Sequence, residues 1–229
     1  IAFISANQEK LPDAVIPLGI LSVTAATPAP HEKLFWDLCF EPGPIETVAR
    51  NLRESQPDIV AIGLRNLQNM DYTNITTNLD AYRAIIRTVR ANSPAPIVLG
   101  GGGFSVMPQR LMEDLGADYG IAGEGELAFP RLLDELAKPE PALDGVDGLY
   151  YLADGIVRFA GHSGRFLALD DLPRPDRSVL PERYYTEYGI ESLQTKRGCP
   201  LHCTYCTYPL IEGPRGRLRD PGKVADEFM

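Results

Sequence analysis

Short, uninterrupted runs of apolar residues are the feature that most narrows the folds open to this chain. The clearest run lies within residues 58–64, after Asp58, and is rich in β-branched side chains, and residues 96–99 contain a second. Runs without polar alternation are typical of parallel strands that are buried on both faces. Segments with apolar residues at helical spacing, such as 79–89, lie between the runs. The chain is therefore predicted to form an α/β fold, a doubly wound, Rossmann-like parallel sheet.

Predicted strands and helices alternate through the first part of the chain. Five parallel strands are expected within residues 1–4, 33–40, 58–64, 96–99 and 117–122, and helices at 17–26, 45–55, 79–89, 110–115 and 125–137. In sheets of this kind, ligands bind at the carboxyl ends of the strands. The loops that follow the strands are therefore the expected place of a functional site.

Three of these loops contain unusual residues. Residues 65–70 follow the third strand, four consecutive glycines (100–103) follow the fourth, and Gly-Glu-Gly-Glu (123–126) follows the fifth. Consecutive glycines let the backbone approach a flat or phosphate-bearing ligand without Cβ clashes, but they also form tight strand–helix turns. A nicotinamide fingerprint fits poorly, because its third glycine would fall at Ser105 and the run follows the fourth strand instead of the first.

Three of the four cysteines lie within eight residues, at Cys199, Cys203 and Cys206. Thiolates are preferred ligands of iron–sulfur clusters, zinc and Cu(I). Three thiolates on one tight loop can hold three irons of a cubane cluster and leave the fourth iron open. A structural zinc site completed by His202 is the alternative, but zinc sites usually have a second cysteine pair, and Cys39 stands alone. The spacing favours a four-iron four-sulfur cluster.

Charge and composition exclude several classes of function. The net charge of −9 argues against a general binder of nucleic acid or membrane surfaces. Residues 191–223 differ, with six basic and three acidic side chains, so this segment either faces an anionic ligand or forms a solvated loop. Apolar runs of membrane-span length are missing from the sequence. Clustered cysteines are typical of a reducing compartment, which predicts a cytoplasmic protein.

The pattern changes after residue 138. Prolines interrupt the chain, and a β-hairpin is expected from residues 149–152 and 156–159 around Asp154 and Gly155. Residues 190–194 are predicted to form the first strand of a second α/β unit, a TIM-like barrel with the cysteine loop at the carboxyl end of that strand. The predicted division is a Rossmann-like domain (1–138), a linker with the hairpin (139–188) and the start of a truncated second domain (189–229).

The cysteine loop resembles that of radical S-adenosylmethionine (SAM) enzymes. The resemblance rests on the C-x₃-C-x₂-C spacing, the Arg-Gly-Cys-Pro lead-in at 197–200, and Tyr205 directly before the last cysteine. In that family the three cysteines bind a four-iron four-sulfur cluster whose fourth iron is chelated by SAM. The residue at the position of Tyr205 lies near the adenine of SAM.

The rest of the chain narrows the resemblance to cobalamin-binding radical SAM enzymes. The start of the first helix, the glycine-rich turn, the Gly-Glu-Gly-Glu turn and the linker at 172–177 are similar to their N-terminal region. The resemblance implies a cobalamin site at the glycine-rich edge of the sheet. The residues implied for cobalamin are Pro17, Leu18, Gly19, Arg65, Asn66, Gly101, Gly102, Gly103, Phe104, Gly123, Glu124, Gly125 and Glu126.

One departure from related cobalamin proteins concerns the ligand below the cobalt. Cobalamin mutases and methionine synthase use Asp-x-His-x-x-Gly, but none of His31, His162 and His202 has this setting. We therefore expect a cobalt without a histidine lower ligand, with the loop 65–70 on that side. Methylthiotransferases are disfavoured, because their N-terminal domain carries three further cysteines and only Cys39 is available.

The resemblance implies a cobalamin-dependent methyltransferase that acts on an unactivated carbon or phosphorus centre through a 5′-deoxyadenosyl radical and methylcobalamin. A cyclase or ring-rearranging enzyme of the same architecture is one alternative. A non-enzymatic iron–sulfur or zinc protein is another. Expected partners are a small-molecule substrate, such as a biosynthetic intermediate, and an electron donor such as flavodoxin or ferredoxin. The chain starts without Met and stops within a predicted helix, so we expect a piece of a longer protein that is inactive alone.

Overall fold

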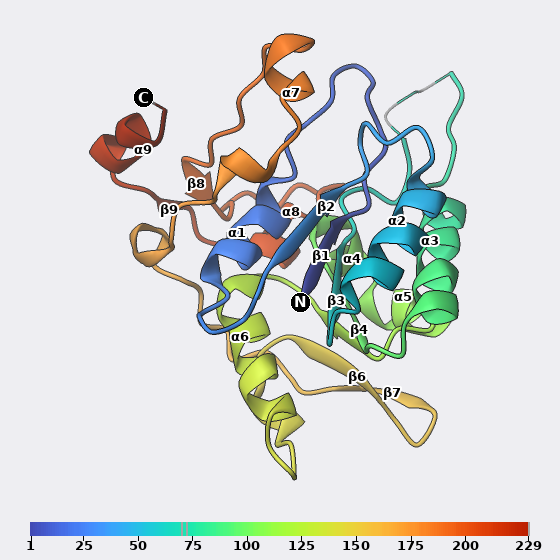
Figure 1. The fold of residues 1–229 in the computed structure, drawn as a ribbon. Helices are drawn as coiled ribbons and strands as arrows, with labels where there is room; N and C mark the ends of the chain where they lie inside the picture. The colour runs from blue at the N-terminus through green and yellow to red at the C-terminus, as the bar shows by residue number, and fades with distance from the viewer. Residues whose placement is uncertain (70, 72, 229) are drawn as a thin grey trace.

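A seven-stranded sheet forms the centre of the molecule (Figure 1). The computed structural model describes residues 1–69, 71 and 73–228. The strand order is β2-β1-β3-β4-β5-β6-β7, and the first five strands are parallel. These five are β1 (Ala2–Ser5), β2 (Leu34–Asp37), β3 (Val60–Gly63), β4 (Ile97–Gly100) and β5 (Tyr119–Ile121). The predicted doubly wound parallel sheet is therefore confirmed.

Helices cover both faces of the sheet. They are α1 (Leu18–Ala26), α2 (Pro44–Ser55), α3 (Leu79–Asn92), α4 (Gly102–Val106), α5 (Pro108–Leu115) and α6 (Gly125–Leu136). Figure 1 shows α1 and α6 on one side of the sheet and α2, α3 and α5 on the other. The prolines that begin α2 and α5 suit the first turn of a helix, where no backbone N–H is needed.

Side chains alternate between two apolar cores along each strand. In β1, Ala2 and Ile4 face the core under α2, α3 and α5, whereas Phe3 faces the core under α1 and α6. The same alternation places Ala61 of β3 and Val98 of β4 beside Phe3. Because both of their faces are buried, the central strands β3 and β4 are apolar without interruption, which is the pattern that predicted them.

The predicted hairpin is present, but it extends the main sheet. Strands β6 (Leu149–Ala153) and β7 (Ile156–Phe159) form it, and β6 pairs antiparallel with β5. Asp154 and Gly155 in the turn both have positive φ, at 53° and 75°, as a two-residue hairpin turn requires. Leu149 and Tyr151 are buried in the core under α6, which explains why the hairpin joins this sheet.

The segment after residue 160 contains short elements. They are η2 (Leu169–Asp171), η3 (Arg177–Val179), α7 (Arg183–Thr186), β8 (Lys196–Arg197), α8 (Tyr208–Glu212), β9 (Arg217–Leu218) and α9 (Pro221–Phe228), and η1 (Leu143–Gly145) precedes the hairpin. Glu227 in α9 bonds the guanidinium groups of Arg177 and Arg219. Among the described residues, no helix is both long enough and apolar enough to cross a membrane.

The prediction of a strand at residues 190–194 is wrong. The structure has the two-residue strand β8 instead, which pairs antiparallel with β9. The backbone carbonyls of Ser192 and Gln194 accept hydrogen bonds from the side chains of Arg177 and Arg219, respectively. These carbonyls are therefore satisfied by guanidinium groups, and no strand ladder forms there.

Candidate functional site

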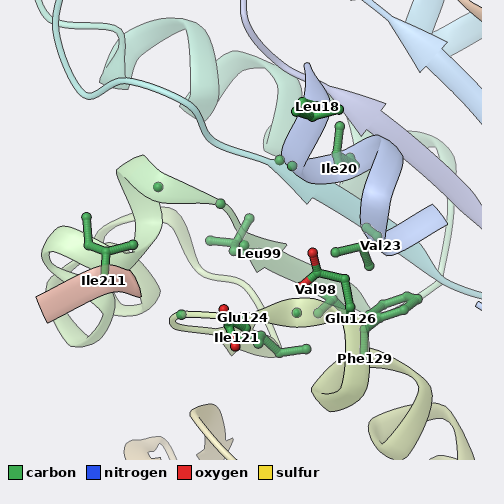
Figure 2. A pocket seen from close by; sticks show the side chains of 18 of the residues that line it. Leu18, Ile20, Val23, Val98, Leu99, Ile121, Glu124, Glu126, Phe129 and Ile211 are labelled. Carbon is green, nitrogen blue, oxygen red and sulfur yellow. The ribbon is translucent and has the colours of Figure 1, made fainter. Parts of the chain in front are cut away.

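A cavity of about 240 Å³ lies between the sheet and helices α1 and α6, and it reaches the carboxyl edge of the strands. Figure 2 shows Ile20 and Val23 of α1 opposite Val98, Ile121 and Phe129. Its body is therefore apolar. The rim is formed by residues 100–102, 123–126, Gln194, Arg197, Ile211 and Glu212.

Small residues create this space. Ala61 of β3 presents a single methyl group to the cavity, between the larger Phe3 and Val98 of the neighbouring strands. At Gly19 of α1, a Cβ would meet no atom within 4 Å. The wall formed by α1 is thus open at this position, and backbone is exposed to whatever occupies the rim.

The four-glycine turn serves two purposes. Gly101 has φ +96°, and a Cβ there would lie 2.6 Å from the carbonyl oxygen of Leu64. A Cβ at Gly103 would lie 3.0 Å from the same oxygen. These two glycines are needed for the close approach of the turn to the end of β3. Gly100 and Gly102 instead have their nearest neighbours at 3.7 and 3.8 Å, and they leave free backbone at the cavity.

The Gly-Glu-Gly-Glu turn carries two carboxylates that bind arginines from the C-terminal segment. Arg197 donates from Nη2 to Glu126 Oε1, from Nη1 to Glu124 Oε1 at 3.4 Å, and from Nε to Gln194 at 2.8 Å. Arg217 Nη2 lies 2.6 Å from Glu124 Oε1. Burial disfavours the charged guanidinium, but the two carboxylates outweigh this and hold the pKa of Arg197 above its usual value.

The cysteine loop starts directly at this arginine. Gly198 has φ +78°, and a Cβ there would overlap the carbonyl oxygen of Arg215, so only glycine fits. The N–H of Cys199 donates to Gly213 O at 3.1 Å, and that of Cys206 donates to Cys203 O at 3.1 Å. The loop is thus tied at its start to the chain that follows it.

The described residues contain no group of three or more His, Cys, Asp and Glu side chains arranged to hold a metal ion. Cys199 and Cys203 are partly buried and Cys206 is exposed, all as free thiols. Their chemistry nevertheless fits the group that the spacing implies, because three soft thiol donors project from one short loop. Their convergence on one metal centre is not a feature of this structure.

Several residues predicted for the site lie outside the cavity. Arg65 is exposed, and the carbonyl of Asn66 accepts hydrogen bonds from Tyr82 and Asn78. Phe104 is fully buried in the core under α2, α3 and α5 and does not line the cavity. The cavity lining also excludes Pro17, Gly103 and Tyr205, and Met70 falls outside the described residues. The predicted residues that line it are Leu18, Gly19, Gly101, Gly102, Gly123, Glu124, Gly125 and Glu126.

Two features of the site are not predictable from local sequence patterns. An apolar strand pattern indicates a core, but it does not show where the core is hollow. The Arg-Gly-Cys-Pro motif contains Arg197, but it does not indicate the partner of this side chain. The sequence does contain an indication of this partner. Two glutamates alternate with glycines at a strand end, and carboxylates that become buried at such a position need cations nearby.

Buried polar residues also fix the linker to the sheet. Tyr184 of α7 donates a hydrogen bond to Asp37 Oδ2 at 2.7 Å, and the N–H of Cys39 donates to Asp37 Oδ1 at 3.1 Å. Burial raises the pKa of Asp37, and the hydrogen bonds from Tyr184 and Cys39 oppose this. Cys39 is therefore a buried thiol beside β2, within an apolar cluster with Phe40.

Comparison with known proteins agrees with this geometry. The B12-binding domain family matches residues 5–133. A tryptophan 2-C-methyltransferase of Streptomyces laurentii is 29% identical, and the match covers 100% of this chain and 46% of that protein. An anaerobic magnesium-protoporphyrin IX monomethyl ester cyclase of Cereibacter sphaeroides is 29% identical over 80% of this chain and 29% of its own length.

A solved structure shares the fold over almost the whole chain. The radical SAM methyltransferase TsrM of Kitasatospora setae, with cobalamin and a [4Fe–4S] cluster bound, superimposes with a TM-score of 0.83 at 23% identity. The match covers 99% of this chain and 44% of that one. The chain thus spans about half the length or less of the relatives it matches. The resemblance to cobalamin-binding radical SAM enzymes is confirmed.

Proposed function

Because the chain belongs to the B12-binding domain family, we propose that it is the cobalamin-binding part of a radical SAM methyltransferase. The observation that carries the proposal is the continuity of two sites. Arg197 lines the cavity at the glycine-rich edge and is separated from Cys199 by one residue. A cofactor at this edge and a cluster on the cysteine loop would therefore be neighbours.

The cavity fits cobalamin in two respects. Its rim offers bare backbone at Gly19, Gly100 and Gly102, where a flat corrin ring can approach without Cβ atoms in the way. Its apolar body, with Val98 and Phe129, suits the flat dimethylbenzimidazole arm of the cofactor. These contacts would bind and orient the cofactor and exclude water from it.

The cysteine loop would hold the cluster and part of SAM. In this proposal Cys199, Cys203 and Cys206 are the iron ligands, and the exposed Tyr205 lies against the adenine. Bound cobalamin, cluster and SAM would supply radical methyl-transfer chemistry, whereas the chain positions them. A one-electron donor such as flavodoxin or ferredoxin and a small-molecule substrate complete the proposal.

The division of the chain follows from this assignment. Residues 1–138 would bind cobalamin, and residues 189–229 would belong to the radical SAM domain. Residues 139–188, whose hairpin extends the sheet of the first part, would connect the two. The loop 65–70 is proposed for the lower side of the cobalt. The carbonyl oxygens of Leu64 and Arg65 pack against the positions of Gly101 and Gly103, which places the start of this loop beside the glycine turn.

A cyclisation reaction is the second candidate, and the cyclase among the relatives favours it. Both reactions can begin with the same cofactors, and the product separates them. Methylation adds one methyl group to the mass of the substrate. Ring closure removes hydrogen and adds no carbon.

The test of the proposal is an anaerobic absorption spectrum of the full-length protein that contains this chain. The protein would be reconstituted with iron, sulfide and hydroxocobalamin and then desalted. We expect retained corrin bands together with broad cluster absorbance. Replacement of Cys199, Cys203 and Cys206 by alanine should remove the cluster absorbance and leave the corrin bands. The matched control is Cys39→Ala, which removes the buried thiol outside the loop and should retain both.

Two results would contradict the proposal. Cluster absorbance without retained corrin would remove the methyltransferase assignment, because the cavity would then serve another ligand. Metal analysis that finds bound zinc, together with no cluster absorbance after reconstitution of the wild-type protein, would remove the radical SAM assignment. Neither result requires that a substrate be identified.

A further inference from the structure

Two arginines lie directly opposite each other at the base of the cysteine loop. Arg197 in β8 and Arg217 in β9 are register partners in the two-stranded ladder. Like charges in this position repel each other and destabilise the pairing of the strands. Both side chains are largely buried, with 7% and 18% of their side-chain surface exposed, so solvent does little to reduce the repulsion. The ladder therefore needs anions close by.

Glu124 and Glu126 supply the anions from a distant part of the chain. Glu126 binds Arg197, and Glu124 contacts both arginines, at 3.4 Å from Arg197 Nη1 and 2.6 Å from Arg217 Nη2. Both glutamates belong to the turn that lines the cavity. We call these four residues the Arg–Glu clamp. It joins the strand that enters the cysteine loop and the strand that follows the loop to the edge of the cavity.

Further bonds hold the base of the loop to the clamp. Arg217 Nη2 donates to the carbonyl of Glu212 at 2.8 Å, and the N–H of Gly198 donates to the carboxylate of the same residue at 3.3 Å. Arg197 uses three different nitrogen atoms on three partners. A lysine ammonium carries the same charge, but it cannot reproduce this planar fork.

We propose that Glu124 and Glu126 are positioning residues, which fix the cysteine loop at one place relative to the cavity. This inference rests on the proposed function, because it assigns to the clamp the separation between cobalamin and the cluster. Radical and methyl transfer depend on this separation, since a misplacement of about 1 Å can cost about 100-fold in rate. Stability alone does not require the clamp, because well-packed apolar residues can replace a buried ion pair at little cost.

The experiment compares four variants of the full-length protein with the wild type. Glu126→Gln removes the negative charge that pairs with Arg197. Glu124→Gln removes the negative charge that contacts both Arg197 and Arg217. Arg197→Lys keeps the charge and loses the fork. The matched control is Glu135→Gln, which removes another buried carboxylate of α6. Its partners, Arg131 and Lys138, lie within four residues of it in sequence and do not belong to the clamp. Thermal unfolding checks that each variant is folded.

The first readout is hydrogen exchange in the apo protein. Loss of a buried charged partner should accelerate amide exchange in residues 196–213 by about 10- to 100-fold. The control variant should exchange in this segment like the wild type. If Glu126→Gln does not fold, Glu124→Gln decides, since it leaves the contact between Arg197 and Glu126 intact.

The second readout is the magnetic coupling between Co(II) and the reduced cluster, measured by electron paramagnetic resonance in the reconstituted protein. The wild type and the control should show one defined separation. Arg197→Lys and the two clamp carboxylate variants should show a broadened distribution while both cofactors remain bound. A role in stability alone would shift the unfolding temperature and leave this distribution unchanged.

Three outcomes would overturn the inference. Glutamate variants with wild-type exchange and wild-type coupling would refute the clamp and leave the proposed function standing. Wild-type coupling in Arg197→Lys would do the same, because the planar fork of the arginine would then have no role. A wild-type protein that retains no corrin would refute the proposed function, and the role of the clamp would fall with it.

Discussion

Alanine substitutions at two adjacent glycines should distinguish what the turn requires from what ligand binding requires. Gly101 has φ 96° and ψ 174°, a backbone region that is open essentially to glycine alone. A side chain there costs about 1–3 kcal/mol in backbone strain, and the Cβ would lie 2.6 Å from Leu64 O. Gly102 is the first residue of α4, and its Cβ would have no neighbour closer than 3.8 Å. Alanine there should be neutral or stabilise by about 0.4–1 kcal/mol.

The two variants should therefore differ in stability, and Gly102→Ala tests the ligand site without destabilising the turn. In urea unfolding, Gly101→Ala should lose at least ~1–3 kcal/mol of stability, whereas Gly102→Ala should not lose any. After desalting, the Gly102→Ala protein should retain less corrin, because Gly102 lines the cavity and an added methyl group would take space at its rim. Gly102→Ala with full retention would refute the assignment of this edge to the corrin. Gly101→Ala with wild-type stability would refute the account of the turn.

Three further predictions concern the cavity, the linker and the C-terminal helix. Ala61→Phe should fill the apolar cavity, so that corrin is no longer retained while the protein still folds; retention at the wild-type level would place the cofactor elsewhere. Tyr184→Phe removes a buried hydrogen bond to Asp37 and should lower the free energy of unfolding by about 1–3 kcal/mol, as measured in urea. Burial opposes the ionisation of Glu227, but two arginines outweigh it and lower its pKa. The ionised carboxylate of Glu227 therefore stabilises the folded protein fully above the unfolded pKa of about 4.3. This stabilisation is lost as the pH falls through the lower pKa of the folded state. The difference in Tm between wild type and Glu227→Gln should therefore shrink below about pH 4.3.

Much of the fold follows from patterns that act over a few residues. Burial on both faces makes a parallel strand apolar throughout, so the run at 58–64 contains β3. An Asp-Gly pair between two apolar runs favours positive φ, so the hairpin turn at Asp154 was predictable. The cysteine spacing and the glycine-rich loops likewise indicated the family without any knowledge of packing.

The failures share one physical cause. Residues 190–194 have the composition of a strand, but two of their carbonyls are occupied by Arg177 and Arg219, which lie elsewhere in the chain. A local pattern contains no information about such partners. The hairpin was predicted correctly, yet its addition to the main sheet depends on apolar contacts of Leu149 with the core under α6.

The candidate site shows most clearly what the sequence predicts and what it does not. Consecutive glycines at a strand end indicate a backbone without Cβ atoms, and the sequence alone establishes this. Which glycines the turn requires depends on Leu64, whose carbonyl approaches two of the four, and one of these two, Gly101, also lines the cavity. Glu126 and Arg197 are 71 residues apart, and only the fold brings their charges together. Propensity and periodicity act through neighbours in sequence, whereas a cavity and a buried charge pair are made by neighbours in space.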